Sequence, residues 1–460
     1  MTRTFLSTVA GAVQDDDCRG RDLARLAVAV LAAFTISTSA LAGSGTPNHP
    51  PIQVDDAQLQ GLNMFQTLGG AEVLPTTRTI PHWWRSIRNP NDGVTYGFNM
   101  AGADPYGCSG WACYVTIEVD ITPMILNVDG MTFSGTDIIV PLLNSPVFAV
   151  NDYGSTPYAT QWSGDLATPP TRGPGGPLSQ ADAGQLLQLQ DAIMRAQFKQ
   201  TGVSNYHLKL QPNVLPSVTI DVPGGQGFLF QNRRGVVSAF VDGAWWATQV
   251  HNQVAKSDPT HLALIMTDDV ITYRGNERSF TPEALGYHGA DITERQTNGN
   301  APVHTFAWAG WLSPGVYARP NGGFLWNYQD IDTVSHEISE WANDPFATND
   351  VQPWLVPFPI TFPCSPLLET GDPVDIVGFA MGTNTFRQGP NPNGTQSADG
   401  YYHAQDEAFL PWFMRLSPNN ISEPTQTPSP NVGRYTFVGD LNIFNFKQPP
   451  PTCTVTFKHF

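Results

Sequence analysis

The sequence predicts an α+β fold that is rich in strands, with long Gly- and Pro-rich loops and one motif helix packed on a sheet. Three observations lead to this fold class. The 460 residues include 42 Gly and 40 Pro but only 14% charged residues, which favours short strands and loops over helical bundles. Apolar residues make up 41% of the chain, enough for a hydrophobic core. Many short apolar or alternating runs stand between Gly, Pro and Asp, whereas residues 332–345 have a helical period.

The N-terminus has the features of a secretory signal peptide over residues 1–42. Arginines between positions 19 and 25 precede an apolar run over residues 26–36, and Ala40-Leu41-Ala42 fits a cleavage site. The run is shorter than the about 20 apolar residues that cross a bilayer, and no later segment reaches that length. We therefore expect a secreted protein, extracellular or periplasmic, without a membrane span.

The charge of the chain restricts its partners. A net charge of −17 repels nucleic acid and anionic membranes, so we expect neither as a partner. An acidic surface of this kind does not oppose the binding of divalent cations.

Four cysteines remain after residue 42: Cys108, Cys113, Cys364 and Cys453. An even number in an exported chain indicates disulfides, and four cysteines allow three pairings. We favour a local bridge between Cys108 and Cys113, which leaves Cys364 to pair with Cys453. A zinc–thiolate site is not expected, because the chain has neither a paired C-x-x-C nor a histidine beside these cysteines.

Residues 43–165 are expected to form an N-terminal β-rich region, with strand patterns at 94–98, 114–119 and 125–128. The Pro- and Gly-rich residues 166–180 form a connector and the expected domain boundary, although a long surface loop within one domain has the same composition. Residues 181–460 then form an α+β region that carries the candidate metal site.

In this second region the apolar spacing predicts an amphipathic helix over 181–198 and a second helix over 402–415. Strands are predicted at 207–210, 217–222, 236–241, 245–250, 261–266, 270–273 and 305–309. We expect His288, in the segment Gly-Tyr-His-Gly-Ala, to lie in a turn from which it can line the same cleft as the motif helix.

The motif helix is predicted over residues 332–345 and ends at an Asp-Pro pair. Successive residues advance about 100° round a helix, so His336 and Glu340 share one face and Asp344 follows one turn later. Apolar residues, Trp341 among them, form the opposite, core-facing side. Carboxylates this close, Glu337 included, repel one another unless a cation or protonation neutralises them.

The run His-Glu-x-x-Glu that begins at His336 differs by one residue from the His-Glu-x-x-His helix that binds zinc in many metalloproteases. A hydrolytic metal site needs three protein ligands and an open position for water. His336 and Glu340 can supply two ligands, and Glu337 has the position of the general base. The third ligand must come from elsewhere. Glu369 is our first choice, and Asp372 and His403 are the next two.

Other roles stay open for the same residues. Tyr402 can polarise a carbonyl or stabilise an oxyanion. Glu369 or Asp372 can instead hold the tautomer of His336 as a hydrogen-bond partner. The simplest alternative is that the helix is merely amphipathic and that its carboxylates face water. The sequence has no G-x-S-x-G and no P-loop, so a serine hydrolase or a nucleotide enzyme has no support.

Four segments resemble those of a set of exported, largely uncharacterised bacterial proteins. They are Ser-His-Glu-Ile-Ser-Glu-Trp-Ala-Asn-Asp-Pro-Phe at 335–346, Leu-Glu-Thr-Gly-Asp-Pro at 368–373, Tyr-His-Ala-Gln-Asp-Glu-Ala-Phe-Leu-Pro-Trp-Phe at 402–413 and Gly-Tyr-His-Gly-Ala at 286–290. A weaker likeness, confined to the motif helix, links the chain to plant exordium/phosphate-induced proteins. The zincin metalloproteases resemble it only through His336 and Glu337. Glu340 stands where they have histidine, and an additional oxygen ligand implies a harder site.

The leading hypothesis is a secreted, divalent-metal-dependent hydrolase of a peptidase-like kind, with a zincin-like helix and an extracellular peptide or polysaccharide as substrate. Zinc is the first choice of metal, with calcium or manganese as alternatives. A second hypothesis is a non-enzymatic secreted or surface protein whose acidic cluster binds a structural cation. A third is a carbohydrate-active or carbohydrate-binding module, because the chain has 12 Trp and 25 Phe and paired carboxylates.

Overall fold

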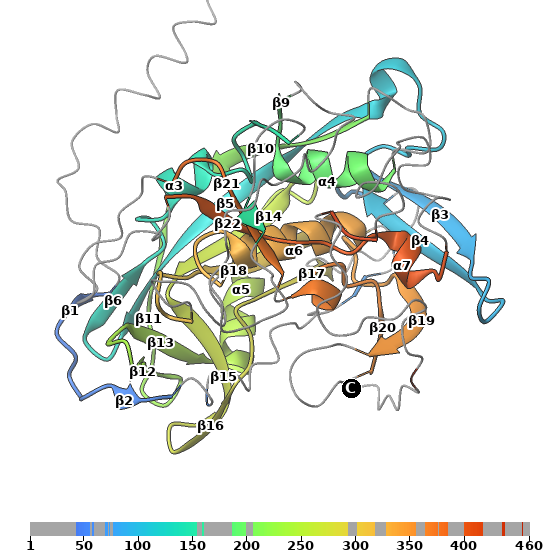
Figure 1. The fold of residues 1–460 in the computed structure, drawn as a ribbon. Helices are drawn as coiled ribbons and strands as arrows, with labels where there is room; N and C mark the ends of the chain where they lie inside the picture. The colour runs from blue at the N-terminus through green and yellow to red at the C-terminus, as the bar shows by residue number, and fades with distance from the viewer. Residues whose placement is uncertain are drawn as a thin grey trace, which may run out of the picture. The chain divides into compact units, whose positions relative to one another are not determined.

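The computed structural model of the chain describes residues 43–55, 58, 70–71, 73, 77–153, 159–160, 186–198, 206–292, 301–317, 328–355, 364–375, 377–384, 400–416, 435–437 and 453. Strands dominate over helices in this part of the chain, so the predicted strand-rich α+β class is confirmed (Figure 1). The predicted signal peptide (1–42) and connector (166–180) lie outside the described residues.

Strand β5 (Tyr114–Val128) is the centre of an eight-stranded sheet. One edge of β5 pairs in parallel with β10 (His207–Val214) and then with β11 (Val218–Asp221). Its other edge pairs with β14 (Leu262–Asp268) in parallel and with β6 (Met131–Ser134) antiparallel, and β6 pairs in turn with β1 (Ser44–Gly45). Beyond β14 lie β18 (Val303–Trp311), parallel to it, and β17 (Gly286–Ile292), antiparallel to β18.

Smaller sheets complete the strands. A five-stranded sheet has the order β16 (Ser279–Pro282), β15 (Val270–Asn276), β13 (Val237–Asp242), β12 (Gly227–Gln231) and β2 (Ile52–Gln53). A three-stranded sheet has the order β22 (Tyr402–Gln405), β21 (Gly378–Met381) and β8 (Ala159–Thr160). The remaining pairs are β3 (His82–Arg88) with β4 (Thr95–Ala101), β19 (Asp350–Leu355) with β20 (Cys364–Leu367), and β7 (Asn151–Asp152) with β9 (Leu186–Leu187).

The helices among the described residues are α3 (Ile139–Asn144), α4 (Leu189–Gln197), α5 (Gly243–Val254), α6 (Asp332–Asn343) and α7 (Leu410–Phe413), and the 3-10 turns include η1 (Gly110–Cys113) and η4 (Asp372–Val374). Because side chains alternate along a strand, β18 packs one helix on each face of the large sheet. Phe306 and Trp308 share a core cluster with α5, whereas Ala307 and Ala309 share another with α6. The small alanines let α6 lie close to the sheet, and Trp341 Nε1 donates to Thr305 Oγ1 at 2.9 Å.

Every residue of α6 is buried, the polar face included. Glu337 is 1% exposed and Glu340 2%, so the alternative that these carboxylates face water is wrong. The apolar side packs on the sheet as predicted. The polar side is covered by the segment around η4 and by β22, which hydrogen-bond to it through Gly371 and Gln405.

The prediction of one helix over residues 402–415 is wrong. Residues 402–405 form β22, which pairs with β21, and a separate short helix, α7, begins at Leu410. Pro411 explains the division, because proline has no N–H to donate and fits only the first turn of a helix. The aromatic residues of α7 are buried, as their spacing indicated.

Three other local predictions also need correction. Residues 245–250 belong to helix α5, not to a strand, and Asp242 caps that helix by accepting from Trp245 N at 2.9 Å. The helix predicted over 181–198 begins only at Leu189, since residues 186–187 pair with β7, and residues 181–185 lie outside the described part. His288 lies in strand β17 and not in a turn.

Both predicted disulfides are confirmed: Cys108 bonds to Cys113, and Cys364 bonds to Cys453. Among the described residues, no helix has the length and apolar character that crossing a membrane requires.

Candidate metal centre

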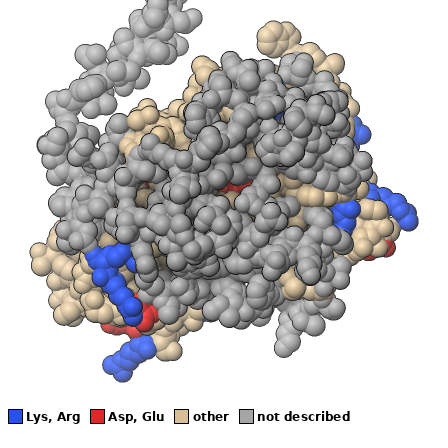
Figure 2. Space-filling view, viewed as in Figure 1, with Lys and Arg blue, Asp and Glu red and all other residues tan. Residues whose placement is uncertain are grey.

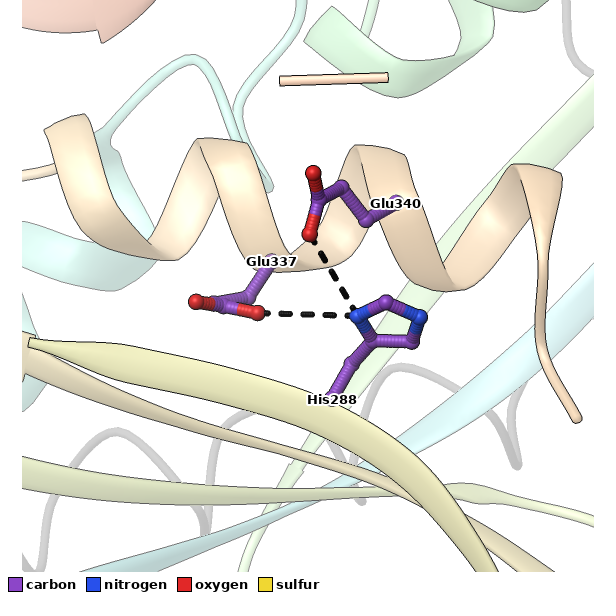
Figure 3. Close-up of side chains that lie close together, drawn as sticks. All are labelled: His288, Glu337 and Glu340. Atoms are coloured by element: carbon purple, nitrogen blue, oxygen red, sulfur yellow. Dashed lines mark ion pairs between the residues drawn. The ribbon is translucent and has the colours of Figure 1, made fainter. Parts of the chain in front are cut away.

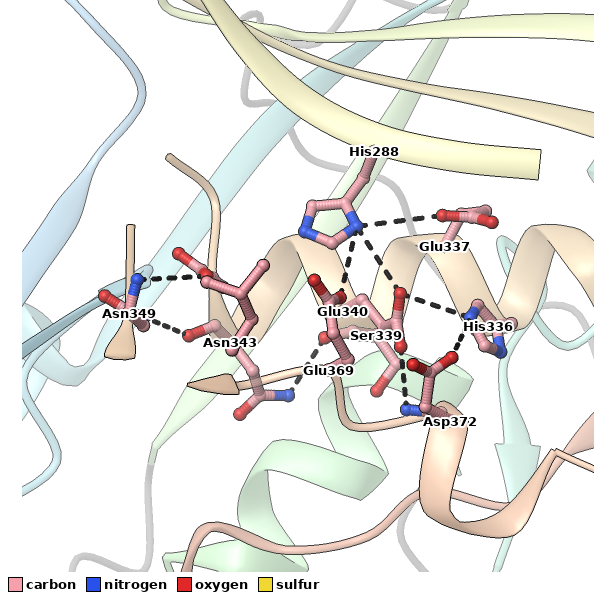
Figure 4. A network of polar contacts seen from close by, with 12 residues as sticks. His288, His336, Glu337, Ser339, Glu340, Asn343, Asn349, Glu369 and Asp372 are labelled. Atoms are coloured by element: carbon pink, nitrogen blue, oxygen red, sulfur yellow. Dashed lines mark hydrogen bonds and ion pairs between the residues drawn. The ribbon is translucent and has the colours of Figure 1, made fainter. Parts of the chain in front are cut away.

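Histidines and carboxylates from three parts of the chain meet on the polar face of α6 (Figure 4). Helix α6 contributes His336, Glu337 and Glu340, strand β17 contributes His288, and the segment leading into η4 contributes Glu369 and Asp372. All six are buried, and none is more than 5% exposed. We refer to these six residues as the polar cluster.

Glu340 is the centre of the polar cluster. Its Oε2 lies 3.1 Å from His336 Nε2 and 3.5 Å from His288 Nδ1, while its Oε1 accepts a hydrogen bond from Gly371 N at 3.1 Å. Asp372 Oδ1 lies 4.0 Å from the same His336 nitrogen. The helical spacing of four residues brings His336 and Glu340 together, as the sequence predicted.

Gln405 sets the orientation of the His336 ring. Its Nε2 donates to the carbonyl oxygen of Gly371 at 2.8 Å, so its Oε1 must be the atom that faces His336 Nδ1 at 2.9 Å. An amide oxygen only accepts, and Nδ1 therefore carries the proton of the neutral ring. The lone pair of the neutral ring is then on Nε2, which faces Glu340 and Asp372.

His288 approaches the cluster from the sheet (Figure 3). Alternation along β17 turns Tyr287 toward the α5 side, where it joins that core cluster, and turns His288 toward α6. His288 Nδ1 lies 3.5 Å from Glu340 Oε2, 3.7 Å from Glu337 Oε2 and 3.9 Å from Glu369 Oε2. One ring nitrogen therefore faces three carboxylates at distances longer than an ordinary hydrogen bond.

Two glycines allow this close packing. A Cβ on Gly371 would lie 2.3 Å from His336 Nδ1, and a Cβ on Gly286 would lie 2.6 Å from Glu337 Oε1. Contacts below 3.0 Å do not occur at real Cβ atoms, so any larger residue would displace the His336 ring or the Glu337 carboxylate.

Positive charge in the cluster comes from histidine. In the part of the chain that the structure describes, no Lys or Arg forms an ion pair with Glu337, Glu340 or Asp372. A buried carboxylate without a compensating cation is costly, and its pKa rises. Burial raises the pKa of Glu337 to about 7. Burial, together with the neighbouring Glu340 and Glu369, raises the pKa of Asp372 well above its usual value.

The pKa shifts of Glu340 and of the two histidines favour the charged form of each group. Burial opposes the charge of Glu340, but the adjacent His336 and His288 outweigh it and lower the Glu340 pKa. Burial likewise opposes protonation of both rings, and the surrounding carboxylates outweigh it, so the pKa values of His336 and His288 are raised. The cluster thus attracts cations, whether protons or metal ions.

His403 and Tyr402 have other partners. His403 Nδ1 lies 2.7 Å from Asp330 Oδ2, and His403 N donates to Asp330 Oδ1 at 2.8 Å. Tyr402 lies on the opposite face of β22 from His403, and its hydroxyl donates to the Pro141 carbonyl at 2.9 Å. Of the residues singled out from the sequence, the structure brings together His336, Glu337, Glu340, Glu369 and Asp372. It gives His403 and Tyr402 contacts outside the cluster.

Gln405, the partner of His336, and Gly371, the donor to Glu340, are not among the residues that the sequence indicated. Further carboxylates, Asp375 and Glu407, are buried near the cluster, and burial raises the pKa of both, to about 7 for Asp375. Gln405 lies two residues after His403, so period-two alternation in a strand would have placed both on one face. Because a helix was predicted over these residues, the alternation typical of a strand was not considered.

Within the described part of the chain, two groups of three donors could hold a metal ion: His336, Glu340 and Asp372, and His288, Glu337 and Glu340. In each group one ligand atom per residue lies within 4.8 Å of the others. A nitrogen and two oxygens form a donor set that zinc and manganese both accept.

Comparisons of the chain with protein-family models, with curated proteins and with solved structures found no match.

Proposed function

We propose that the chain binds a divalent cation between His336, Glu340 and Asp372 and uses it to hydrolyse an extracellular substrate. The observation that carries the proposal is the direction of the His336 ring. Gln405 holds its Nδ1, and its Nε2 lies 3.1 Å from Glu340 Oε2 and 4.0 Å from Asp372 Oδ1. A lone pair and two anionic oxygens that converge in a buried place repel one another, and a cation between them converts the repulsion into bonds.

The spacing of the donors suits a small divalent ion. Two donors at about 2.1 Å from a tetrahedral ion lie about 3.4 Å apart, close to the distance between His336 and Glu340. Asp372 needs only a small side-chain movement to reach the same ion. We propose zinc first, because of the imidazole ligand, and manganese or calcium as alternatives, because two of the three donors are carboxylates.

The proposed chemistry is metal-assisted hydrolysis. A bound divalent cation lowers the pKa of a water molecule at its open position and polarises a carbonyl group. Glu337 follows His336 directly and is buried beside it, so it is the carboxylate in place to receive the proton of that water. In peptidases with a His-Glu-x-x-His helix, the glutamate that follows the first histidine has this role. On that basis we propose a peptide substrate, with a polysaccharide as the alternative.

A substrate needs a path to the cluster. On the face in Figure 2, acidic atoms are visible near the middle, at the position where Figure 1 draws α6. The two disulfides fit an oxidising compartment, and we propose export on that ground together with the N-terminal sequence.

The test uses the purified mature chain, stripped with a chelator and then offered zinc, manganese and calcium in turn. We expect bound metal by mass spectrometry and metal-dependent cleavage within a panel of quenched peptides and soluble polysaccharides. Glu337→Gln should lose turnover and keep the ion held by His336, whereas Glu118→Gln, a half-exposed position outside the cluster, should behave as wild type. Absence of bound metal with all three ions would overturn the proposal.

A second candidate function is a structural cation in a non-enzymatic protein. The observation that favours it is the near-complete burial of ligands from α6 and from the segment that carries Asp372, which one ion would tie together. In that case metal removal lowers the melting temperature, no substrate in the panel turns over, and Glu337→Gln changes neither result.

A further inference from the structure

One carboxylate oxygen lies close to two histidines that belong to different elements. Glu340 Oε2 lies 3.1 Å from His336 Nε2, on its own helix, and 3.5 Å from His288 Nδ1, on strand β17 (Figure 4). The two donor groups at this site, His336 with Asp372 and His288 with Glu337, therefore have Glu340 in common.

Glu337 gives an independent indication of a ligand on the His288 side. The residue is 1% exposed, and among the described residues neither of its carboxylate oxygens has a hydrogen-bond partner. Oε1 lies against Gly286, and Oε2 faces His288 Nδ1 at 3.7 Å (Figure 3). That separation exceeds a hydrogen bond, whereas it is close to the spacing of about 3.6 Å between two donors that share a tetrahedral ion at about 2.2 Å.

We propose that the centre holds two divalent cations, the first between His336, Glu340 and Asp372 and the second between His288, Glu337 and Glu340, with Glu340 as the bridging ligand. The proposal deepens the function proposed above and rests on the first ion.

Charge balance favours two ions over one. Glu337, Glu340 and Asp372 carry three negative charges when ionised, and no Lys or Arg among the described residues forms an ion pair with them. One divalent ion leaves a net negative charge in a buried place, which is costly. The charge of two divalent ions is larger by one than the charge of the three carboxylates. Glu369 supplies a fourth carboxylate, because its Oε2 lies 3.9 Å from His288 Nδ1.

A second ion changes the part that Glu337 plays. In sites with two ions about 3.5–4 Å apart, both ions polarise the attacking and leaving oxygens, and a shared water loses its proton more readily. Glu337 then acts as a ligand of the second ion through Oε2. The same Glu337→Gln variant therefore separates the two versions of the site, because only with two ions does the substitution reduce the metal content.

The experiment measures the number of ions and the distance between them, without any substrate. Metal-free protein is titrated with Mn²⁺, and bound manganese is counted by mass spectrometry and examined by electron paramagnetic resonance. We expect two equivalents in the wild type and an exchange-coupled spectrum from the bridged pair. His288→Gln and Glu337→Gln should each retain one equivalent with the uncoupled spectrum of an isolated ion.

The matched control is His261→Gln, a histidine that pairs with Asp120 outside the cluster, which should retain two coupled ions. A single equivalent with an uncoupled spectrum in the wild type would overturn the second ion while leaving the proposed function intact. If the protein binds no manganese, zinc or calcium, both the second ion and the proposed function are overturned. The wild-type spectrum decides the matter even where a variant does not fold.

Discussion

The side-chain amide of Gln405 and the imidazole of His336 form a fixed pair: Gln405 Oε1 lies 2.9 Å from His336 Nδ1 while Gln405 Nε2 donates to the Gly371 carbonyl. A single strand residue thus joins the motif helix to the segment that carries Asp372. Metal-binding histidines commonly donate their second N–H to such a partner, which fixes the tautomer and the ring direction.

Gln405→Leu should weaken metal binding without removing a ligand. Loss of the Nδ1 partner frees the ring to rotate and to change tautomer, and partners of this kind are worth about 10–100-fold in metal affinity. The measurement is a competition titration of zinc against a chromophoric chelator. Gln352→Leu removes another buried glutamine, one that bonds to Asn89, and should leave the affinity unchanged. Equal affinities for Gln405→Leu and wild type would contradict the assigned role.

Gly371→Ala should disturb the site through one added methyl group. The backbone of Gly371 has φ −78°, which alanine adopts readily, so any effect comes from contact and not from backbone strain. The new Cβ would lie 2.3 Å from His336 Nδ1 and must displace the ring. We expect a loss of about 1–3 kcal/mol in stability, as for other overpacked cores, together with weaker metal binding.

The matched control for that variant is Gly224→Ala, at a position where nothing lies within 4 Å of an added Cβ. Thermal unfolding and the zinc titration should both give wild-type values for the control. A Gly371→Ala protein that binds zinc as tightly as wild type would show that the His336 ring has room to move.

The core of the site was predictable from the sequence because helical geometry is local. His336 and Glu340 meet through four-residue spacing within α6, and no knowledge of the rest of the fold is needed. The acidic segment around Glu369 and Asp372 was also found, since it is the next concentration of carboxylates along the chain. Nothing local showed that Asp372 would face His336 or that Glu369 would approach His288.

The parts that could not be predicted depend on pairing between distant strands. His288 enters the cluster because β17 pairs with β18 beneath α6, a contact that no local pattern encodes. Gln405 enters because residues 402–405 pair with β21, which overrides the helical spacing of the aromatic residues that follow. The burial of the polar face has the same origin, since the segment around η4 and strand β22 cover it.

Removal of the Cys364–Cys453 bridge should cost more stability than removal of the Cys108–Cys113 bridge. The first closes a loop with a sequence separation of 89 and the second one of 5. Loop-closure entropy predicts about 4–5 kcal/mol for the long loop and about 2 kcal/mol for the short one. Serine pairs at each bridge, compared by denaturant unfolding, measure the difference.

The long bridge also bears on the metal centre. Cys364 begins β20, which leads directly into the segment of Glu369 and Asp372, so we expect the Cys364→Ser, Cys453→Ser protein to bind zinc more weakly. The protein without the short bridge is the matched control and should keep its affinity. Equal zinc affinities in the two proteins would indicate that the segment holds its position without the bridge.

The stability gained from metal should grow as the pH rises from about 4.5 to 7. Burial raises the pKa of Glu337 and that of Asp375 to about 7, so without metal the folded state binds protons that the unfolded state releases at lower pH. Stability rises with pH only where the unfolded state binds more protons than the folded state. In this window the folded state binds more protons, so the metal-free protein loses stability as the pH rises. A divalent cation replaces those protons, and the loss disappears.

Melting temperatures of metal-free and zinc-loaded protein at pH 5 and pH 7.5 test this. The difference between the two forms should be small at pH 5 and large at pH 7.5, and a difference that is the same at both values would mean that protons and metal do not compete for the polar cluster.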